Sequence, residues 1–146
     1  MTSRALSFLL LALQAPEPGV LGDVQRSNIE ANVPPASEFA ALLKRDLEAY
    51  FKAAQSQAAR VEHDLLRDGP TQSGVSYPKF YVWVRVFDGA ALVNQGAVRL
   101  AAIDRKRFDV TTFMSAEAIR EDPAGLYKVF PAPVCEKIRA KMDTRR

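Results

Sequence analysis

The residues of this sequence that could perform nucleophilic or acid–base chemistry are few. It contains one histidine, His63, and one cysteine, Cys135. Glu62 and Asp64 flank His63, but strand neighbours point to opposite faces, so neither carboxylate easily orients the imidazole as a general base. Zinc sites need several Cys or His ligands, so no metal site and no cofactor are expected. Cys135 cannot form an internal disulfide and is expected to be a buried structural thiol.

A second group of candidates lies in the apolar stretch over 79–87. Its odd-numbered positions carry large aromatic rings around one cation, and these are our candidate ligand- or partner-binding residues: Tyr81, Trp83, Arg85 and Phe87. Aromatic residues and arginine are enriched in binding hot spots, so an open face of this composition would favour a protein partner or a small ligand.

Two alternatives remain for this face. It is either open, or covered by C-terminal helices that supply Tyr127, Phe130 and Ile138 as packing partners. Arg85 needs an acidic partner in either case, and we expect Asp109, Glu117 or an anionic ligand.

Other charged and glycine-containing segments carry weaker signals. Residues 68–74 include Gly69 and Gly74 but lack the lysine and helix start of a phosphate-binding loop. Basic residues gather over 105–107 and 137–146 without a nucleic-acid-binding motif, so no nucleic acid is expected as a partner. Binding of the basic tail to an anionic surface remains a weaker alternative.

The N-terminal segment resembles a secretory signal. Arg4 precedes an apolar run over 5–15, which is too short to span a membrane as a helix. Pro16 disfavours cleavage after Ala15, whereas Val20 and Gly22 suit cleavage after residue 22. We therefore expect a signal peptide over 1–22, a periplasmic or secreted location and no transmembrane segment after its removal. The alternative is an amphipathic first helix of a cytosolic protein.

The remaining chain is expected to form one domain. The 146 residues are 48% hydrophobic and 25% charged with a formal net charge of +3, an ordinary globular composition. Prolines and polar residues predict an extended linker over 23–36, a single domain over 37–142 and a basic tail over 143–146. Apolar residues spaced by three and four predict a helix over 37–57, with Ser37 as its N-cap.

The middle of the chain is predicted to form antiparallel strands. Residues 60–68 fit a helix or a strand, and we favour the strand. Alternation predicts a strand over 79–87, a two-residue turn at Asp88-Gly89 and a return strand over 91–103. The apolar phase changes in that return strand, which predicts a bulge at Gln95-Gly96 that puts Val93, Val98, Leu100 and Ala102 on the core face.

The last third is expected to contain one more strand and then short helices. The strand over 108–114 would place Phe108, Val110, Thr112 and Met114 on one face. Ser115 would cap a helix over 116–121, Asp122-Pro123 would begin a second, and a third would follow Pro131 and Pro133.

This element order resembles the cystatin-like or NTF2-like arrangement, in which a curved sheet grips a helix. The resemblance covers about residues 37–115, concerns the fold alone and implies an α+β domain. Neither segment 95–99 nor segment 72–76 matches the Gln-x-Val-x-Gly loop of cystatins, so protease inhibition of that kind is not expected. NTF2-like enzymes pair an acid with a tyrosine in a pocket, roles that Tyr81 and Asp109 would take here.

The favoured hypothesis is therefore an exported, non-enzymatic binding module for a protein partner in the cell envelope. The alternative is a small-ligand-binding or isomerase/hydratase-like enzyme of the NTF2 type.

Overall fold

The computed structural model of the protein describes residues 18–144, with the side chains of residues 20–144. Its elements follow in the order α2 (Pro18–Asn32), α3 (Ala36–Ala54), β1 (Ala59–Leu65), β2 (Lys79–Asp88), β3 (Ala91–Ile103), β4 (Arg107–Ser115), α4 (Ala116–Glu121), the 3-10 helix η1 (Pro123–Lys128) and α5 (Ala132–Asp143). The expected α+β class with an antiparallel sheet is confirmed. The signal-like run over 5–15 and the last two arginines lie outside the described residues.

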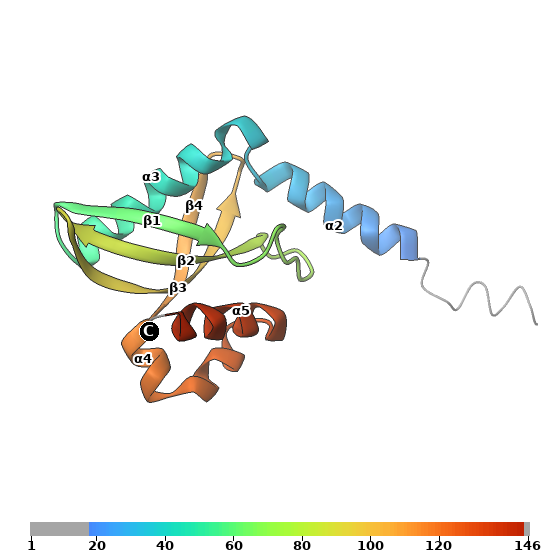
Figure 1. Ribbon diagram of the computed structural model, residues 1–146. Coiled ribbons are helices and arrows are strands. Elements are labelled where there is room, and N and C mark those ends of the chain that lie inside the picture. The colour runs from blue at the N-terminus through green and yellow to red at the C-terminus, as the bar shows by residue number, and fades with distance from the viewer. Residues whose placement is uncertain (1–17, 145–146) are drawn as a thin grey trace, which may run out of the picture.

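The sheet is a four-stranded antiparallel meander in the order β1-β2-β3-β4. Helix α3 lies across one face, and α4, η1 and α5 lie on the other (Figure 1). The segment over 60–68, which fitted a helix or a strand, forms strand β1 over 59–65. Because β1 and β4 each pair with one neighbour only, the sheet has two edges.

Two apolar clusters form the core, one on each face of the sheet. The first joins α3 to the sheet through Leu43, Leu47 and Phe51, which all lie on one side of the helix. Val98, Leu100 and Ala102 belong to it, as predicted, whereas Val93 is 43% exposed, so its predicted place in the core is wrong. The strand residues of this cluster are Ala59, Val61, Phe80, Val82, Val84, Val86, Val98, Leu100, Ala102 and Phe108.

The second cluster joins the opposite face of the sheet to the C-terminal helices. Tyr81 and Trp83 from β2 contribute to it, together with Leu66 just after β1. The helices cover them with residues that are nearly all fully buried: Ala116, Ile119, Leu126, Phe130, Val134, Cys135 and Ile138. The sheet is therefore sandwiched between helices, which explains why β2 is apolar on both faces.

The hairpin between β2 and β3 differs from the predicted one in its turn and in its bulge. Asp88 pairs with Ala91, so the two loop residues are Gly89 and Ala90, with Gly89 at a φ of 62°. The register shifts between Val86 and Phe87, which makes Val93 the extra residue rather than Gln95-Gly96. The bulge lies near the turn because a local change in twist is accommodated more easily there than in the buried centre.

Gly96 has a different role from the predicted one. It pairs with Ser115 of β4, and a Cβ at this position would lie 2.2 Å from the Met114 carbonyl oxygen. The close approach of β3 and β4 requires a glycine here, a backbone contact that alternation along one strand does not indicate.

Strand β4 carries a second irregularity at Thr111. The pairing shifts between Arg99 and Leu100, leaving Thr111 without a direct partner on β3. The predicted common face is therefore wrong: Val110 packs with the α3 cluster, whereas Met114 packs with the opposite cluster. The Arg99 guanidinium donates to the Thr111 hydroxyl, at 2.8 Å between nitrogen and oxygen, which holds the bulge in place.

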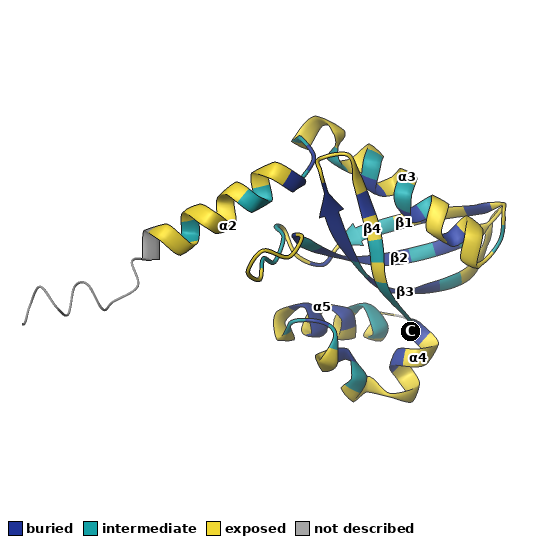
Figure 2. Cartoon of the chain, turned by 180° about the vertical axis from the view of Figure 1, so that it is seen from behind, coloured by how far each residue is buried: buried dark blue, intermediate teal, exposed yellow. Residues whose placement is uncertain are grey.

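The linker predicted over 23–36 is helical as far as Asn32, so the prediction of an extended arm is wrong for this part. Figure 1 shows α2 projecting from the body, and Figure 2 shows most of its surface exposed. Its C-terminal end is anchored by two side chains. The Asn28 amide donates to the Ser76 carbonyl at 2.8 Å, and the Asn32 side chain accepts from the Asp104 backbone N–H at 3.0 Å.

Helix termini were predicted with mixed success. Helix α3 begins at Ala36 with Pro35 at the N-cap, so Ser37 is not its cap. Ser115 does cap α4, because its side chain accepts from the Ala118 N–H. Asp122 precedes η1 without a side-chain capping bond.

Candidate functional site

The aromatic half of the predicted binding face lies inside the molecule. Tyr81 is 4% exposed and Trp83 is 3% exposed beneath the C-terminal helices. Phe130 contacts Tyr81 with 6.0 Å between the ring centroids, and Ile138 belongs to the same cluster. Tyr127, by contrast, is 49% exposed and is not a packing partner. Of the two alternatives for this face, the covered one is observed, so Tyr81 and Trp83 present no open binding surface.

Arg85 and Phe87 are the two predicted site residues that remain partly accessible. Arg85 lies opposite Glu62 and next to Asp64 of the neighbouring strand, and its guanidinium is 2.9 Å from the Asp64 carboxylate and 3.6 Å from Glu62. The predicted partners of Arg85, Asp109 and Glu117, were therefore wrong. The sequence contained the signal, because Glu62 and Asp64 face the same side of β1 as Arg85 does of β2 once the two strands are paired.

This pairing extends into a charged network over β1, β2 and α5. Lys141 of α5 lies 2.9 Å from the Asp64 carboxylate, and Arg60 lies 2.8 Å from Glu62. Hydrogen bonds from Lys141 and then Arg85 lower the pKa of Asp64, and the bond from Arg60 lowers the pKa of Glu62. The Arg60 guanidinium also stacks 4.6 Å from the centre of the Phe87 ring.

The outer edge of β1 is accessible toward its C-terminal end, where His63 is half-buried and Leu65 is 44% exposed. Leu66 donates its N–H to the Tyr81 carbonyl, so the even-numbered residues of this strand direct their backbone groups toward β2. The odd-numbered residues Val61, His63 and Leu65 therefore direct their N–H and C=O groups away from the sheet. The β1–β2 register is regular throughout, so these groups are evenly spaced. Val61 is 2% exposed, which leaves the outward groups of His63 and Leu65 as the accessible ones.

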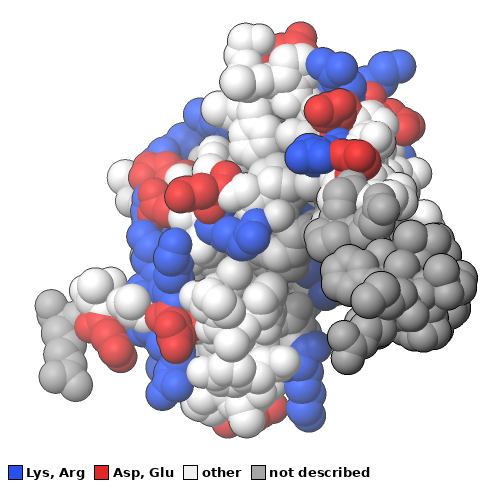
Figure 3. Space-filling model, turned by 90° about the vertical axis from the view of Figure 1, so that its right-hand side faces the viewer, with Lys and Arg blue, Asp and Glu red and all other residues white. Residues whose placement is uncertain are grey.

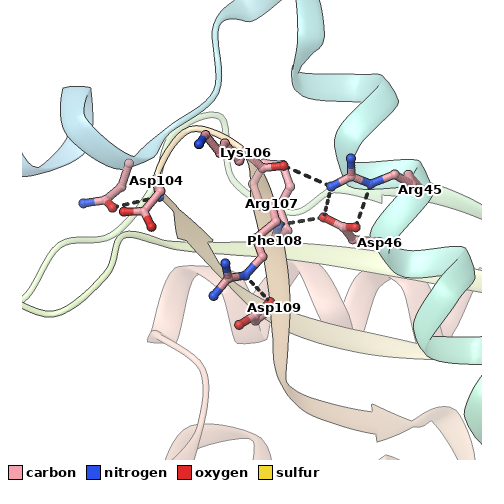
Figure 4. A network of polar contacts seen from close by, with 8 residues as sticks. Arg45, Asp46, Asp104, Lys106, Arg107, Phe108 and Asp109 are labelled. Atoms are coloured by element: carbon pink, nitrogen blue, oxygen red, sulfur yellow. Dashed lines mark hydrogen bonds and ion pairs between the residues drawn. The ribbon is translucent and has the colours of Figure 1, made fainter.

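The other edge of the sheet is closed where β4 begins (Figure 4). The Phe108 N–H points away from β3 and donates to the Asp46 carboxylate of α3 at 2.7 Å. Arg45 donates to the Lys106 carbonyl at 3.0 Å in the preceding turn. The bulge at Thr111 then interrupts the strand, so β4 offers no regular row like that of β1.

An apolar hollow of about 360 Å³ lies beside the C-terminal end of β1. Leu65, which is 44% exposed, forms one wall, and Asp68 contributes the one charged group of the lining. Within residues 20–144 the structure gives Asp68 no ion pair, and the neighbouring Arg67 donates to the carbonyls of Gly69 and Pro70. The other lining residues are Val33, Pro34, Ala36, Phe39, Pro70 and Phe80.

The loop between β1 and β2, which the sequence did not assign to a function, shapes this region. Thr71 forms a bridge with Lys79, and its hydroxyl shares a hydrogen bond of 2.7 Å with the Tyr81 hydroxyl. Beyond it the loop exposes Val75 (92%) and Tyr77 (45%). Figure 3 views this end of the molecule, where a band of uncharged residues runs between groups of Lys, Arg, Asp and Glu.

The residues that could perform catalysis are kept apart. His63 lies on the α3 side of β1, whereas Cys135 is buried in the opposite cluster and donates its thiol to the Phe130 carbonyl at 3.3 Å. The Tyr81 hydroxyl bonds to Thr71, and exposed Asp109 pairs with Arg107, so neither contact joins the acid and tyrosine of the NTF2-like alternative. The described part of the chain therefore provides no assembled acid–base pair among these candidates.

Two further observations concern metal binding and membrane-spanning helices. Among residues 20–144, no three histidine, cysteine, aspartate or glutamate side chains gather to hold a metal ion. None of the helices described between residues 18 and 144 has the length and apolar character to cross a bilayer.

Comparison with known proteins adds no assignment, since no family model, no curated protein and no solved structure matches the chain.

Proposed function

We propose that the protein is an exported, non-enzymatic binding module, periplasmic or secreted, that takes up an extended segment of a protein partner along strand β1. The observation that carries this proposal is the difference between the two sheet edges. β1 offers partly accessible outward backbone groups at His63 and Leu65, while β4 is capped by Asp46 and interrupted by a bulge.

Strand addition to an exposed edge is a recurring mode of peptide recognition. The backbone hydrogen bonds supply affinity, and the side chains on either face supply selectivity. On one face of β1, Arg60 presents a positive charge, and Glu62 and Asp64 present negative charges. Charged residues on an edge strand disfavour unspecific pairing with other strands, which favours a selective partner.

The proposal of export rests on the signal-like segment over 1–22. Its proposed cleavage point after Gly22 lies before Asn28, the first described residue that donates a side-chain hydrogen bond to the body of the domain. Cleavage there leaves the anchoring contacts of Asn28 and Asn32 intact. The position of α3 across a twisted antiparallel sheet is in keeping with the cystatin-like or NTF2-like fold that we propose for the domain.

Photo-cross-linking in the native envelope tests the binding surface. A photoreactive residue replaces Leu65 on β1 in one variant and Asp109 on β4 in a matched control, both exposed positions on edge strands. We expect a discrete cross-linked partner from position 65 alone. Equal products from both positions, or none from either, would overturn the proposal.

Two substitutions at His63 separate backbone from side-chain effects. His63→Pro removes the outward N–H from an edge strand, where proline is tolerated, whereas His63→Val keeps that N–H and removes the imidazole. Cross-linking should be lost with proline and kept with valine. Loss with both variants would show that the imidazole, not the strand edge, binds the partner.

Export is tested by fractionation and mass measurement of the protein expressed in its source cells. The expected mature chain begins at Asp23, and Leu10→Arg, which places a charge in the apolar run, should block export. Full-length chain that keeps residues 1–22 in the cytoplasm would refute this half of the proposal.

A further inference from the structure

We propose that the hollow at the end of β1 holds one lysine or arginine side chain of the bound segment. This inference rests on the proposed function, because it assigns the side-chain chemistry that the β1 edge selects. Leu65 belongs to both features: its backbone ends the outward row, and its side chain forms a wall of the hollow. A strand paired along β1 would therefore place one of its side chains beside this opening.

The chemistry of the lining defines that side chain. Phe39, Phe80 and Pro70 offer apolar surface, and Asp68 supplies a single carboxylate. Lysine and arginine combine a long aliphatic stem with a terminal cation, so the stem can lie on the apolar walls while the cation reaches the carboxylate. An aliphatic residue would leave Asp68 without a partner, and an acidic residue would meet it with like charge.

The other charges near the hollow leave Asp68 available. The Arg67 guanidinium donates to two backbone carbonyls of the same loop, and Lys79 donates to the Tyr77 carbonyl. The acids of the neighbouring network, Glu62 and Asp64, already pair with Arg60, Arg85 and Lys141. Asp68 is thus an unpaired carboxylate, among the described residues, at the rim of an apolar hollow.

Small probes test the hollow separately from the strand edge. The mature protein, labelled with ¹⁵N, is titrated with n-pentylammonium, n-pentanol and pentanoate while its amide signals are followed. We expect saturable shifts around Leu65, Asp68 and Phe80, with pentylammonium binding about three- to five-fold more tightly than pentanol and pentanoate binding least. Added salt should reduce the preference for the cation.

Three variants test whether binding of these probes depends on Asp68 and on the hollow. Asp68→Asn should remove the preference for the cation, and Ala36→Phe should fill the hollow and abolish binding of all three probes. Glu121→Gln, an exposed change on α4, should alter neither the preference for the cation nor the binding of the probes. It serves as the charge-matched control. Equal binding of pentylammonium and pentanol to the unaltered protein, or an unchanged preference in Asp68→Asn, would overturn the inference.

A peptide pair links the hollow to the strand edge. One peptide has eight alternating threonine and valine residues with a single central lysine, and its control has norleucine there. We expect the lysine peptide to bind about three- to five-fold more tightly, and only when Asp68 is present. A partner that cross-links at position 65 without any lysine preference would refute this inference and leave the proposed function standing. Cation binding in the hollow with no strand binding at β1 would refute the proposed function instead.

Discussion

The Asp46 carboxylate of α3 accepts the outward backbone N–H of Phe108 on β4 at 2.7 Å, so a helix side chain occupies a hydrogen-bonding position that a further strand would otherwise take. Asp46 also pairs with Arg45, whose guanidinium reaches the Lys106 carbonyl (Figure 4). This contact ties α3 to the edge of the sheet and makes the two edges unequal.

Replacing Asp46 with alanine should therefore lower the free energy of unfolding by about 1.5–3 kcal/mol, the usual effect of losing a hydrogen bond to a charged group. Trp83, the one tryptophan of the sequence and a core residue, reports unfolding by its fluorescence in urea. Glu48→Ala is the control on the same helix. A smaller loss in Asp46→Ala than in this control would show that the contact does not stabilise the edge.

Gly96→Ala should destabilise the domain by about 1–3 kcal/mol, because the new methyl group would press on the β4 backbone at Met114. Gly69→Ala is the matched change, since its Cβ would meet only the end of the Arg67 side chain at 3.8 Å. Urea denaturation of both variants, followed through Trp83, compares the two. Equal stabilities would contradict the close approach of β3 and β4.

The Cys135 thiol should be almost unreactive toward a thiol reagent in the native protein and become reactive on unfolding. Its side chain is fully buried, and burial raises the pKa of the thiol, so little thiolate forms at neutral pH. The labelling rate is measured across urea concentrations and compared with the Trp83 fluorescence. Rapid labelling under native conditions would show that α5 opens independently of the sheet.

Stability should decrease as the pH falls below the ordinary imidazole pKa, and His63 should account for part of this decrease. Burial lowers the pKa of His63, with the positive charges of Lys44 and Arg85 in the same direction and Asp64 in the opposite one. The unfolded chain therefore takes up the proton first, and the stabilisation present above the ordinary value near 6.5 is lost as the pH drops toward the lowered value.

The comparison is between urea midpoints at pH 7.5 and pH 5 for the unaltered protein and for His63→Gln. The variant should lose less stability over this interval, because it has no imidazole to protonate. An identical loss in both proteins would assign the pH dependence to other groups.

The burial of Trp83 changes what a substitution at this position would measure. Trp83→Ala should remove a core side chain and cost about 3–5 kcal/mol, so it reports on folding rather than on binding. The exposed positions of β1 and the rim residue Asp68 are the appropriate targets for binding experiments.

Much of the fold was predicted from local sequence patterns. The wrong predictions concern features that depend on contacts between elements. The alternation of Phe80, Val82 and Val84 predicted the strand over 79–87 correctly, because it is a local pattern of one strand. The bulge position was wrong because the pairing register of β2 and β3 depends on the turn at Gly89 and on backbone packing at Gly96. The linker over 23–36 was predicted to be extended from its prolines and polar residues, although two of those polar residues, Asn28 and Asn32, anchor a helix to the body.

The candidate site was likewise predicted from the sequence only in part. The sequence by itself determined that the chain has one histidine and one cysteine, that it contains an antiparallel α+β domain, and that a signal-like run precedes it. Only the tertiary structure decided that the aromatic half of the predicted face is covered, that Arg85 pairs across strands with Asp64, and that β1 remains the open edge. Composition and periodicity report which residues avoid water, whereas the choice of what covers them depends on which distant segments pack together.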